Sequence, residues 1–171
     1  MGTKARPPIP IETQVEVLFR DGWLCSLCGR PTVFHLALKH LNEFVHTRNP
    51  DRPLAYWDLR WRRDAAPLLN ELAACIDHVQ AYSRDGAHDI TNFAVACARC
   101  NARKGNKAKG DYLEANPLWR VKSKHGEPKN WDGLSSIFVV LAKDNRTHLT
   151  PKDREWLIAL ERYFATSTRE G

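Results

Sequence analysis

Two Cys-x-x-Cys pairs constrain this chain more than any other feature of its sequence. Cys25 and Cys28 form the first pair, Cys97 and Cys100 form the second, and 68 residues separate them. Four thiolates are the tetrahedral ligand set that structural Zn²⁺ prefers. Two unrelated pairs of buried thiols are the alternative, but a duplicated Cys-x-x-Cys in an intracellular chain is a specific zinc signal. The spacing therefore predicts one zinc ion that joins distant parts of the chain.

Length and composition are those of one soluble globular domain, with 171 residues, 43% hydrophobic and 27% charged. The longest apolar run, residues 137–142, is too short to cross a membrane. Residues 1–10 lack the apolar stretch of a secretory signal. We therefore expect a cytoplasmic protein without membrane association, whose cysteines stay reduced and available as metal ligands or buried thiols.

The net charge of +6 is concentrated in one segment. Residues 97–130 contain nine Lys or Arg and three Asp or Glu, which accounts for the whole excess. Such a basic segment suits a polyanion as partner. A solvated basic helix explains the charge equally well, so charge alone does not decide between the two.

Hydrophobic periodicity predicts helices on both sides of a short strand pair. Residues 75–81 have the pattern of a strand, and 93–96 would return after a loop dense in turn residues. The second Cys pair would then lie at a strand-to-helix junction and the first on a loop, which is the layout of a treble clef. A basic helix is expected from residue 98, and apolar residues at helical spacing predict further helices at 10–20, 34–45, 64–72, 134–141 and from 151.

A set of polar residues between the Cys pairs could carry chemistry. Hydrolysis of a phosphodiester needs a base for water, a divalent cation at the phosphate and a group that orients the base. His78 offers an imidazole that titrates near neutrality, and Asp77 and Asn101 offer hard oxygen ligands. Each residue alone has an ordinary explanation, such as a surface pair or a helix cap. Adjacent strand residues also point to opposite sides, unless the strand twists or bulges at its end.

The order Cys-x-x-Cys, Asp-His, Asn, Cys-x-x-Cys-Asn-x-x-Lys resembles the HNH endonuclease family in its zinc-bound ββα-metal form, over residues 25–30 and 75–104. The resemblance implies an α+β fold, with a treble-clef HNH core embedded in a mainly helical single domain. We expect a flexible tail at 1–9, a nuclease core at 10–116 with a helical insertion at 34–72, and a C-terminal helical region at 117–171 packed on the core.

The resemblance also implies a role for each matching residue. His78 would be the general base, Asp77 a ligand of the catalytic cation, and Asn92 the residue that ties the loop backbone and so orients His78. Asn101 stands at the final position, where the family often has His, so this chain would be an H-N-N variant. Oxygen ligands favour Mg²⁺ or Mn²⁺ as the catalytic ion.

The implied activity is one-metal hydrolysis of DNA that leaves 5′-phosphate and 3′-hydroxyl ends. A zinc-stabilised module that binds nucleic acid without cleaving it is the alternative, although it would need neither Asp77 nor His78. A third possibility is a nuclease subunit of a multi-protein defence complex, in which the C-terminal helices bind a partner protein or a second copy of the chain.

Several further residues have open roles. Cys75 is expected to be a small buried hydrophobic residue, and His88 a surface residue. In residues 56–63, Trp57 and Trp61 would pack in the core or contact a nucleic-acid backbone. The candidate phosphate contacts are basic side chains for which mere solvation is an equal alternative: Arg84, Arg99, Arg103, Lys104 and Lys107.

Overall fold

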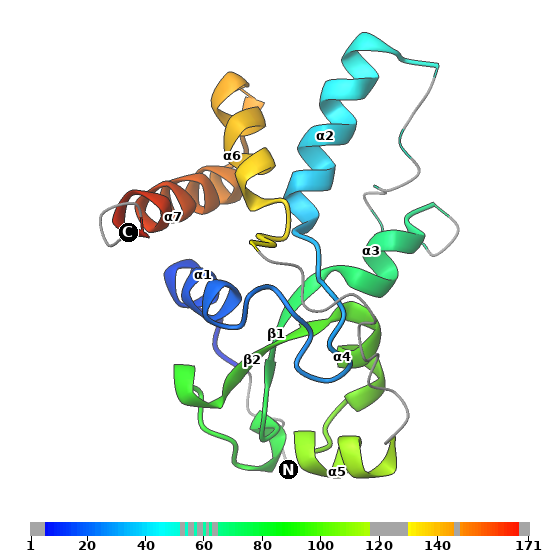
Figure 1. The fold of residues 1–171 in the computed structure, drawn as a ribbon, viewed down its shortest axis with the longest axis vertical. Helices are drawn as coiled ribbons and strands as arrows, with labels where there is room; N and C mark the ends of the chain where they lie inside the picture. The colour runs from blue at the N-terminus through cyan, green and yellow to red at the C-terminus, as the bar shows by residue number, and fades with distance from the viewer. Residues whose placement is uncertain are drawn as a thin grey trace.

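A computed structural model describes residues 6–51, 54, 57, 60, 62, 65–116, 130–145 and 148–167. In this part of the chain, helices surround one two-stranded antiparallel sheet (Figure 1), so the predicted α+β class is confirmed. None of the described helices is both long and apolar enough to span a bilayer. The elements are α1 (Ile11–Arg20), α2 (His35–Arg48), α3 (Pro67–Leu72), β1 (Ala74–His78), β2 (Phe93–Cys97), α4 (Ala98–Lys104), α5 (Lys109–Ala115), α6 (Ser135–Asp144) and α7 (Pro151–Ser167).

The hairpin is regular along its whole length. Its register runs from Ala74 opposite Cys97 to His78 opposite Phe93, without a bulge. The strand predicted to reach residue 81 ends at His78, because Asn92 takes over the next backbone groups. Its carbonyl accepts from Val79 N at 2.8 Å, and its side chain accepts from Gln80 N at 2.8 Å. The connecting loop, residues 79–92, contains two short 3₁₀ turns, η1 (Tyr82–Arg84) and η2 (Ile90–Asn92).

The two faces of β1 meet different neighbours, because successive strand residues point to opposite sides. Ala74 and Ile76 pack against the main hydrophobic core, to which α1 contributes Val15, Val17 and Leu18. Asp77, on the opposite face, meets Lys104 of α4. The hairpin therefore lies between the main core and α4, and α4 follows β2 directly.

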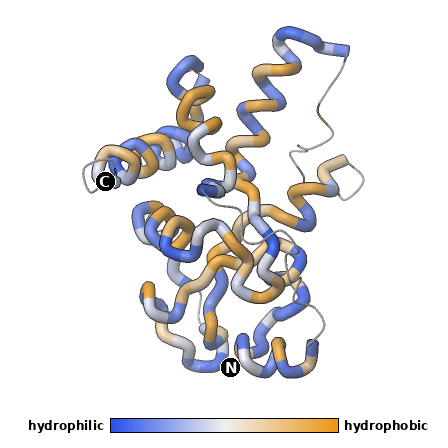
Figure 2. The backbone as a smooth tube through the Cα atoms, in the orientation of Figure 1, coloured by the Kyte–Doolittle hydropathy of each residue, from blue (hydrophilic) through white to orange (hydrophobic). Residues whose placement is uncertain are grey.

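The C-terminal helices share the core of the hairpin. The ring of Phe34 lies 5.2 Å from that of Phe138 in α6 and 4.9 Å from that of Trp156 in α7, measured between centroids. Both belong to the same buried cluster as Val17 of α1 and Val95 of β2. Figure 2 shows the alternation of hydrophilic and hydrophobic positions along α2 and α7 that is typical of amphipathic helices. The hairpin, α1 and the two C-terminal helices thus share one buried cluster.

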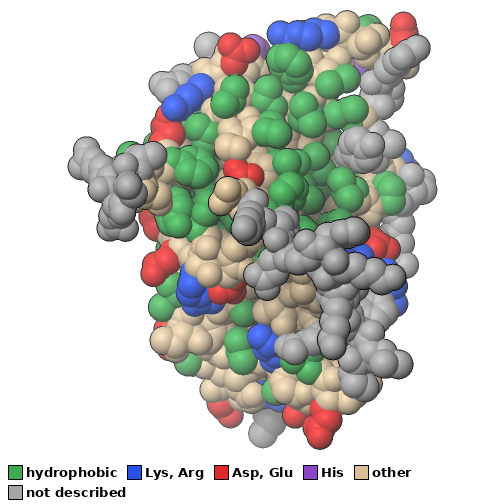
Figure 3. All heavy atoms as spheres, viewed as in Figure 1, with side chains coloured by type: hydrophobic (Ala, Val, Ile, Leu, Met, Phe, Trp, Pro, Cys, Tyr) green, Lys and Arg blue, Asp and Glu red, His purple; other side chains and the backbone are tan. Residues whose placement is uncertain are grey.

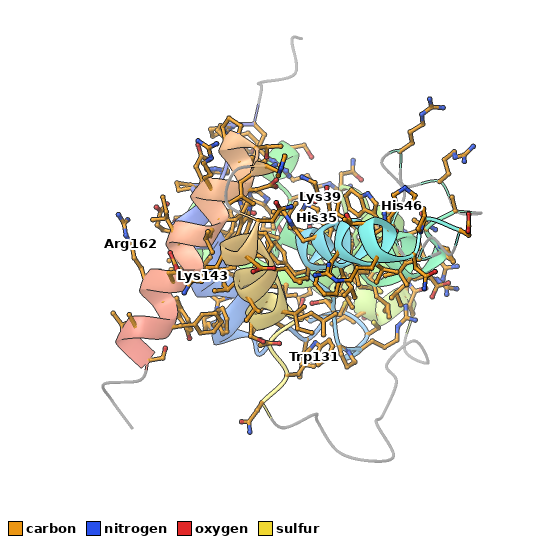
Figure 4. The ribbon with its side chains drawn as sticks, turned by 90° about the horizontal axis from the view of Figure 1, so that it is seen from above. His35, Lys39, His46, Trp131, Lys143 and Arg162 are labelled. Atoms are coloured by element: carbon orange, nitrogen blue, oxygen red, sulfur yellow. The ribbon has the colours of Figure 1, made fainter. Side chains whose placement is uncertain are left out.

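Ion pairs connect the same helices at their edges. Lys39 Nζ of α2 lies 2.7 Å from Asp153 Oδ2 of α7, and Lys143 Nζ of α6 lies 2.8 Å from Glu161 of α7. Figure 4 labels both lysines and shows α6 and α7 on one side of α2. Asp153 also accepts from Thr150 N at 3.2 Å, and Thr150 Oγ1 accepts from Asp153 N at 3.2 Å, so the two residues form a capping box at the start of α7.

Some expectations lie partly or wholly outside the described residues. These include the tail at 1–5, Trp61, and the basic residues between 117 and 129. Trp57 is described, and it packs against the cluster of Val33, Leu38 and Leu69. That contact favours core packing for Trp57 over contact with nucleic acid.

Candidate active site and metal centre

Four thiols meet at the end of the hairpin. The Sγ atoms of Cys25, Cys28, Cys97 and Cys100 all lie within 4.8 Å of one another, and each residue is at most 1% exposed. Tetrahedral zinc with Zn–S bonds of about 2.3 Å places its sulfur atoms about 3.8 Å apart. The distance between Cys28 Sγ and Cys97 Sγ is 3.9 Å. The four cysteines can therefore hold a metal ion, and the donor set fits Zn²⁺.

Local backbone geometry presents the first Cys pair. Cys25 N donates to Arg30 O at 2.9 Å, and Gly29 N donates to Cys25 O at 2.7 Å, which closes a tight turn. Gly29 has a φ of 75°, a conformation that glycine adopts without steric cost. The guanidinium of Arg30 lies 4.0 Å from Cys97 Sγ. Its positive charge there offsets the net negative charge of a zinc ion bound by four thiolates.

Asp77 faces α4 and is paired with a buried lysine. Lys104 Nζ lies 3.1 Å from Asp77 Oδ2 and donates to His78 O at 2.9 Å, and Lys104 is 1% exposed. Burial raises the pKa of Asp77, while the charge of Lys104 opposes that shift. The expectation that Lys104 contacts a phosphate is wrong, because its ammonium is enclosed between β1 and α4 instead of facing solvent.

His78 faces the loop, on the side of β1 opposite Asp77. Its Nε2 lies 3.2 Å from Nδ1 of His88, and its ring packs edge-on against Phe93 with centroids 4.9 Å apart. His78 is 2% exposed, and its pKa is lowered to about 4, chiefly by burial, with smaller contributions from the charges of Arg6, His88 and Lys104. The imidazole is therefore neutral at pH 7. The expected surface role of His88 is wrong, since this half-buried ring faces His78.

Asn92 ties the two ends of the loop together. Its side-chain amide accepts from Gln80 N at 2.8 Å and donates to Gln80 O at 2.9 Å and to Ala87 O at 2.7 Å. A Cβ at Gly86 would lie only 2.0 Å from Gln80 O, so the close approach of the loop backbone requires glycine there. Together these contacts define the path of the loop past His78.

Asn101 lies on α4 and contacts β1 at Cys75, two residues before Asp77. Its side chain hydrogen-bonds the thiol of Cys75 and lowers its pKa, although burial dominates and raises that pKa to about 11. Cys75 and Asp77 share a face of β1, and Asn101 and Lys104 are three residues apart on α4. The two expected oxygen ligands thus lie at the same β1–α4 interface, each beside a different neighbour.

The basic side chains expected to contact phosphate differ in exposure. Arg99 Nη1 is bonded to Glu71 at 3.1 Å, whereas Arg84, Arg103 and Lys107 are exposed. A cleft of about 640 Å³ opens beside Asn101, lined among others by Asn70, Glu71, Cys75, Arg99 and Arg103.

Arg6 is a residue that sequence reasoning missed. Its positive charge lowers the pKa of both Asp77 and His78. The sequence carries no signal for this, because Arg6 stands in a polar, proline-rich segment far from the motif. The contact of His88 with His78 was also missed. The position of His88 in the loop closed by Asn92 could have predicted it.

Comparison with known families agrees with this geometry. Residues 69–107 match the family model described as HNH endonuclease, and the match covers the end of α3, the hairpin and α4. The resemblance is thereby confirmed for this segment, which indicates a nuclease domain with a nucleic-acid substrate. Searches of curated proteins and of solved structures find no match for the chain.

Proposed function

We propose that this chain is a metal-dependent HNH endonuclease that hydrolyses phosphodiester bonds of DNA. The observation that carries the proposal is the HNH segment, in which Asp77 and His78 are consecutive residues at the end of β1, with side chains on opposite faces of the strand. Asn92 holds the loop beside His78. Asn101 lies on α4, at the interface with β1 that Asp77 also faces. Zinc bound by the four cysteines would fix the position of α4 relative to β2.

His78 would remove the proton from the attacking water. Its lowered pKa keeps the imidazole neutral at physiological pH, so its lone pair is available. Asp77 and Asn101 would hold Mg²⁺ or Mn²⁺, which supplies Lewis-acid stabilisation of the charge on the phosphate. Exposed Arg6, Arg84, Arg103 and Lys107, together with Arg99, would bind backbone phosphates.

A zinc-stabilised binding module without cleavage is the second candidate. It is favoured because both reactive side chains already have partners within the protein. Asp77 is paired with Lys104, and Nε2 of His78 faces His88. A role as a subunit of a larger complex is supported by apolar side chains exposed on the C-terminal helices, among them Val140 at 66%. Figure 3 shows hydrophobic side chains gathered in the upper half of one face.

A nuclease assay separates these candidates. Supercoiled plasmid, single-stranded DNA and RNA are incubated with the protein in Mg²⁺, Mn²⁺ or EDTA, and zinc content is measured after each incubation. We expect DNA to be cleaved only with an added divalent cation, and the products to be ligated without prior phosphorylation. Cleavage of RNA alone would refute the DNA substrate, and tight DNA binding without cleavage in either metal would establish the binding module.

The exposed basic residues of α4 and the turn after it give a separate prediction. Replacing Arg103 and Lys107 by Ala is expected to reduce the slope of log affinity against log salt by about 0.9 for each lost phosphate contact, because fewer counterions are released. Fluorescence anisotropy with a duplex measures the slope. Arg154 and Arg162 are exposed on α7, away from α4 (Figure 1), and their double Ala variant is the control. Equal slopes in both variants would place the α4 charges outside the interface.

A further inference from the structure

The imidazole rings of His88 and His78 face each other within the proposed active site. Nε2 of His78 lies 3.2 Å from Nδ1 of His88, and the ring centroids are 5.3 Å apart. The other ring nitrogen of His88, Nε2, is buried and has no hydrogen-bond partner among the described residues. His88 therefore has no competing polar contact there that would turn it away from His78.

The surroundings hold both rings in place. The ring of Phe93 meets the two imidazoles edge-on, with centroids 4.9 Å from His78 and 5.2 Å from His88. Tyr82 packs against both from η1, at 5.9 and 5.6 Å. Asn92 donates to Ala87 O, which fixes the backbone directly before His88. The contact between the imidazoles is thus built into the loop.

We propose that His88 is a positioning residue that sets the tautomer and the orientation of His78. A neutral imidazole carries a single ring proton. If Nε2–H of His78 donates to Nδ1 of His88, the lone pair of His78 is on Nδ1, where it can accept a proton from water. The opposite arrangement, in which His88 donates, would occupy the lone pair on Nε2 and place the proton on Nδ1. His78 would then have no free acceptor.

This inference rests on the proposed role of His78 as general base, and two kinds of variant probe it. His88→Leu removes the acceptor at similar volume. His88→Asn keeps an acceptor, because its Oδ1 lies near the position of the imidazole Nδ1. His46, an exposed histidine on α2 labelled in Figure 4, supplies the control His46→Leu. Zinc content and thermal unfolding show whether each variant is folded.

The first measurement is independent of activity. Two-bond and three-bond ¹H–¹⁵N correlations on the zinc-loaded, histidine-labelled protein report which nitrogen of His78 carries the proton. We expect Nε2–H in the wild type, in His88→Asn and in His46→Leu, and a mixture of tautomers in His88→Leu. An unchanged tautomer in folded His88→Leu would overturn the inference. A wild-type His78 protonated on Nδ1 would overturn it even if the variants failed to fold.

The second measurement is steady-state cleavage of DNA. His88→Leu is expected to lower kcat by about 3-fold or more with little change in KM, because only the fraction of His78 in the productive tautomer and orientation can take the proton. His88→Asn should recover most of that loss. If the wild type cleaves and His88→Leu has the same kcat, the inference fails while the nuclease function stands. If the wild type cleaves nothing, the nuclease function fails, and the tautomer measurement still decides whether His88 sets the state of His78.

Discussion

Replacing His78 by Ala is expected to lower the rate of DNA cleavage by about 10²–10⁴-fold, the usual contribution of a positioned general base. DNA affinity and zinc content should stay close to those of the wild type, because His78 is not among the four thiol ligands. The ring is buried against Phe93, so alanine also removes packing. His78→Gln fills more of that space and serves as the matched variant. Single-turnover cleavage on one DNA substrate measures the rate.

Loss of Asp77 should also abolish cleavage, but for a different reason. Alanine would leave the ammonium of Lys104 buried without its carboxylate partner, which destabilises the fold. Asp77→Asn keeps an oxygen at the site and is the better variant. Raising Mg²⁺ or Mn²⁺ should partly restore its activity, because the missing function is a cation ligand. Metal should not restore His78→Ala, because proton removal is missing there, although higher pH supplies some hydroxide.

The metal titration on both variants therefore decides between the two functions. Cleavage by His78→Ala at the wild-type rate would show that the motif is structural, and the binding module would replace the nuclease. Rescue of both variants by metal to the same extent would contradict the division of roles between Asp77 and His78.

Removing the zinc site is expected to have the largest effect on folding. Structural zinc in small domains binds with about 10–16 kcal/mol, which is comparable to the whole stability of a typical domain. The four thiols connect the turn at Cys25 and Cys28, the end of β2 and the start of α4. Cys100→Ser should therefore give insoluble or partly unfolded protein, as judged by circular dichroism.

Cys75 provides the control for this prediction. It lies outside the thiol cluster, and its thiol donates to Ala73 O at 3.7 Å and interacts with the side chain of Asn101. Cys75→Ser should stay folded and keep one zinc per chain by elemental analysis. A folded, well-behaved wild-type preparation that contains no zinc would refute the assignment.

Much of the local architecture follows from sequence alone. The spacing of the cysteines predicted that Cys25, Cys28, Cys97 and Cys100 would meet, because coordination of one ion needs only the right donors and a chain able to bring them together. The hairpin and α4 were likewise expected, since strand alternation and the strand-to-helix junction at Cys97 are short-range patterns. The resemblance of the motif to the HNH family depended on the same order of residues.

The environment of each reactive side chain was decided by the tertiary structure. Lys104 belongs to a basic segment and was expected on the surface, but α4 packs on β1 so that its ammonium is enclosed beside Asp77. His88 faces His78 because Asn92 and Gly86 fold the loop back on itself, and Arg6 approaches the site from a distant segment. Sequence patterns specify donors and periodicity. Contacts between distant segments decide which surfaces cover a side chain, and no local pattern encodes those contacts. They therefore also decide its burial, its partners and its pKa.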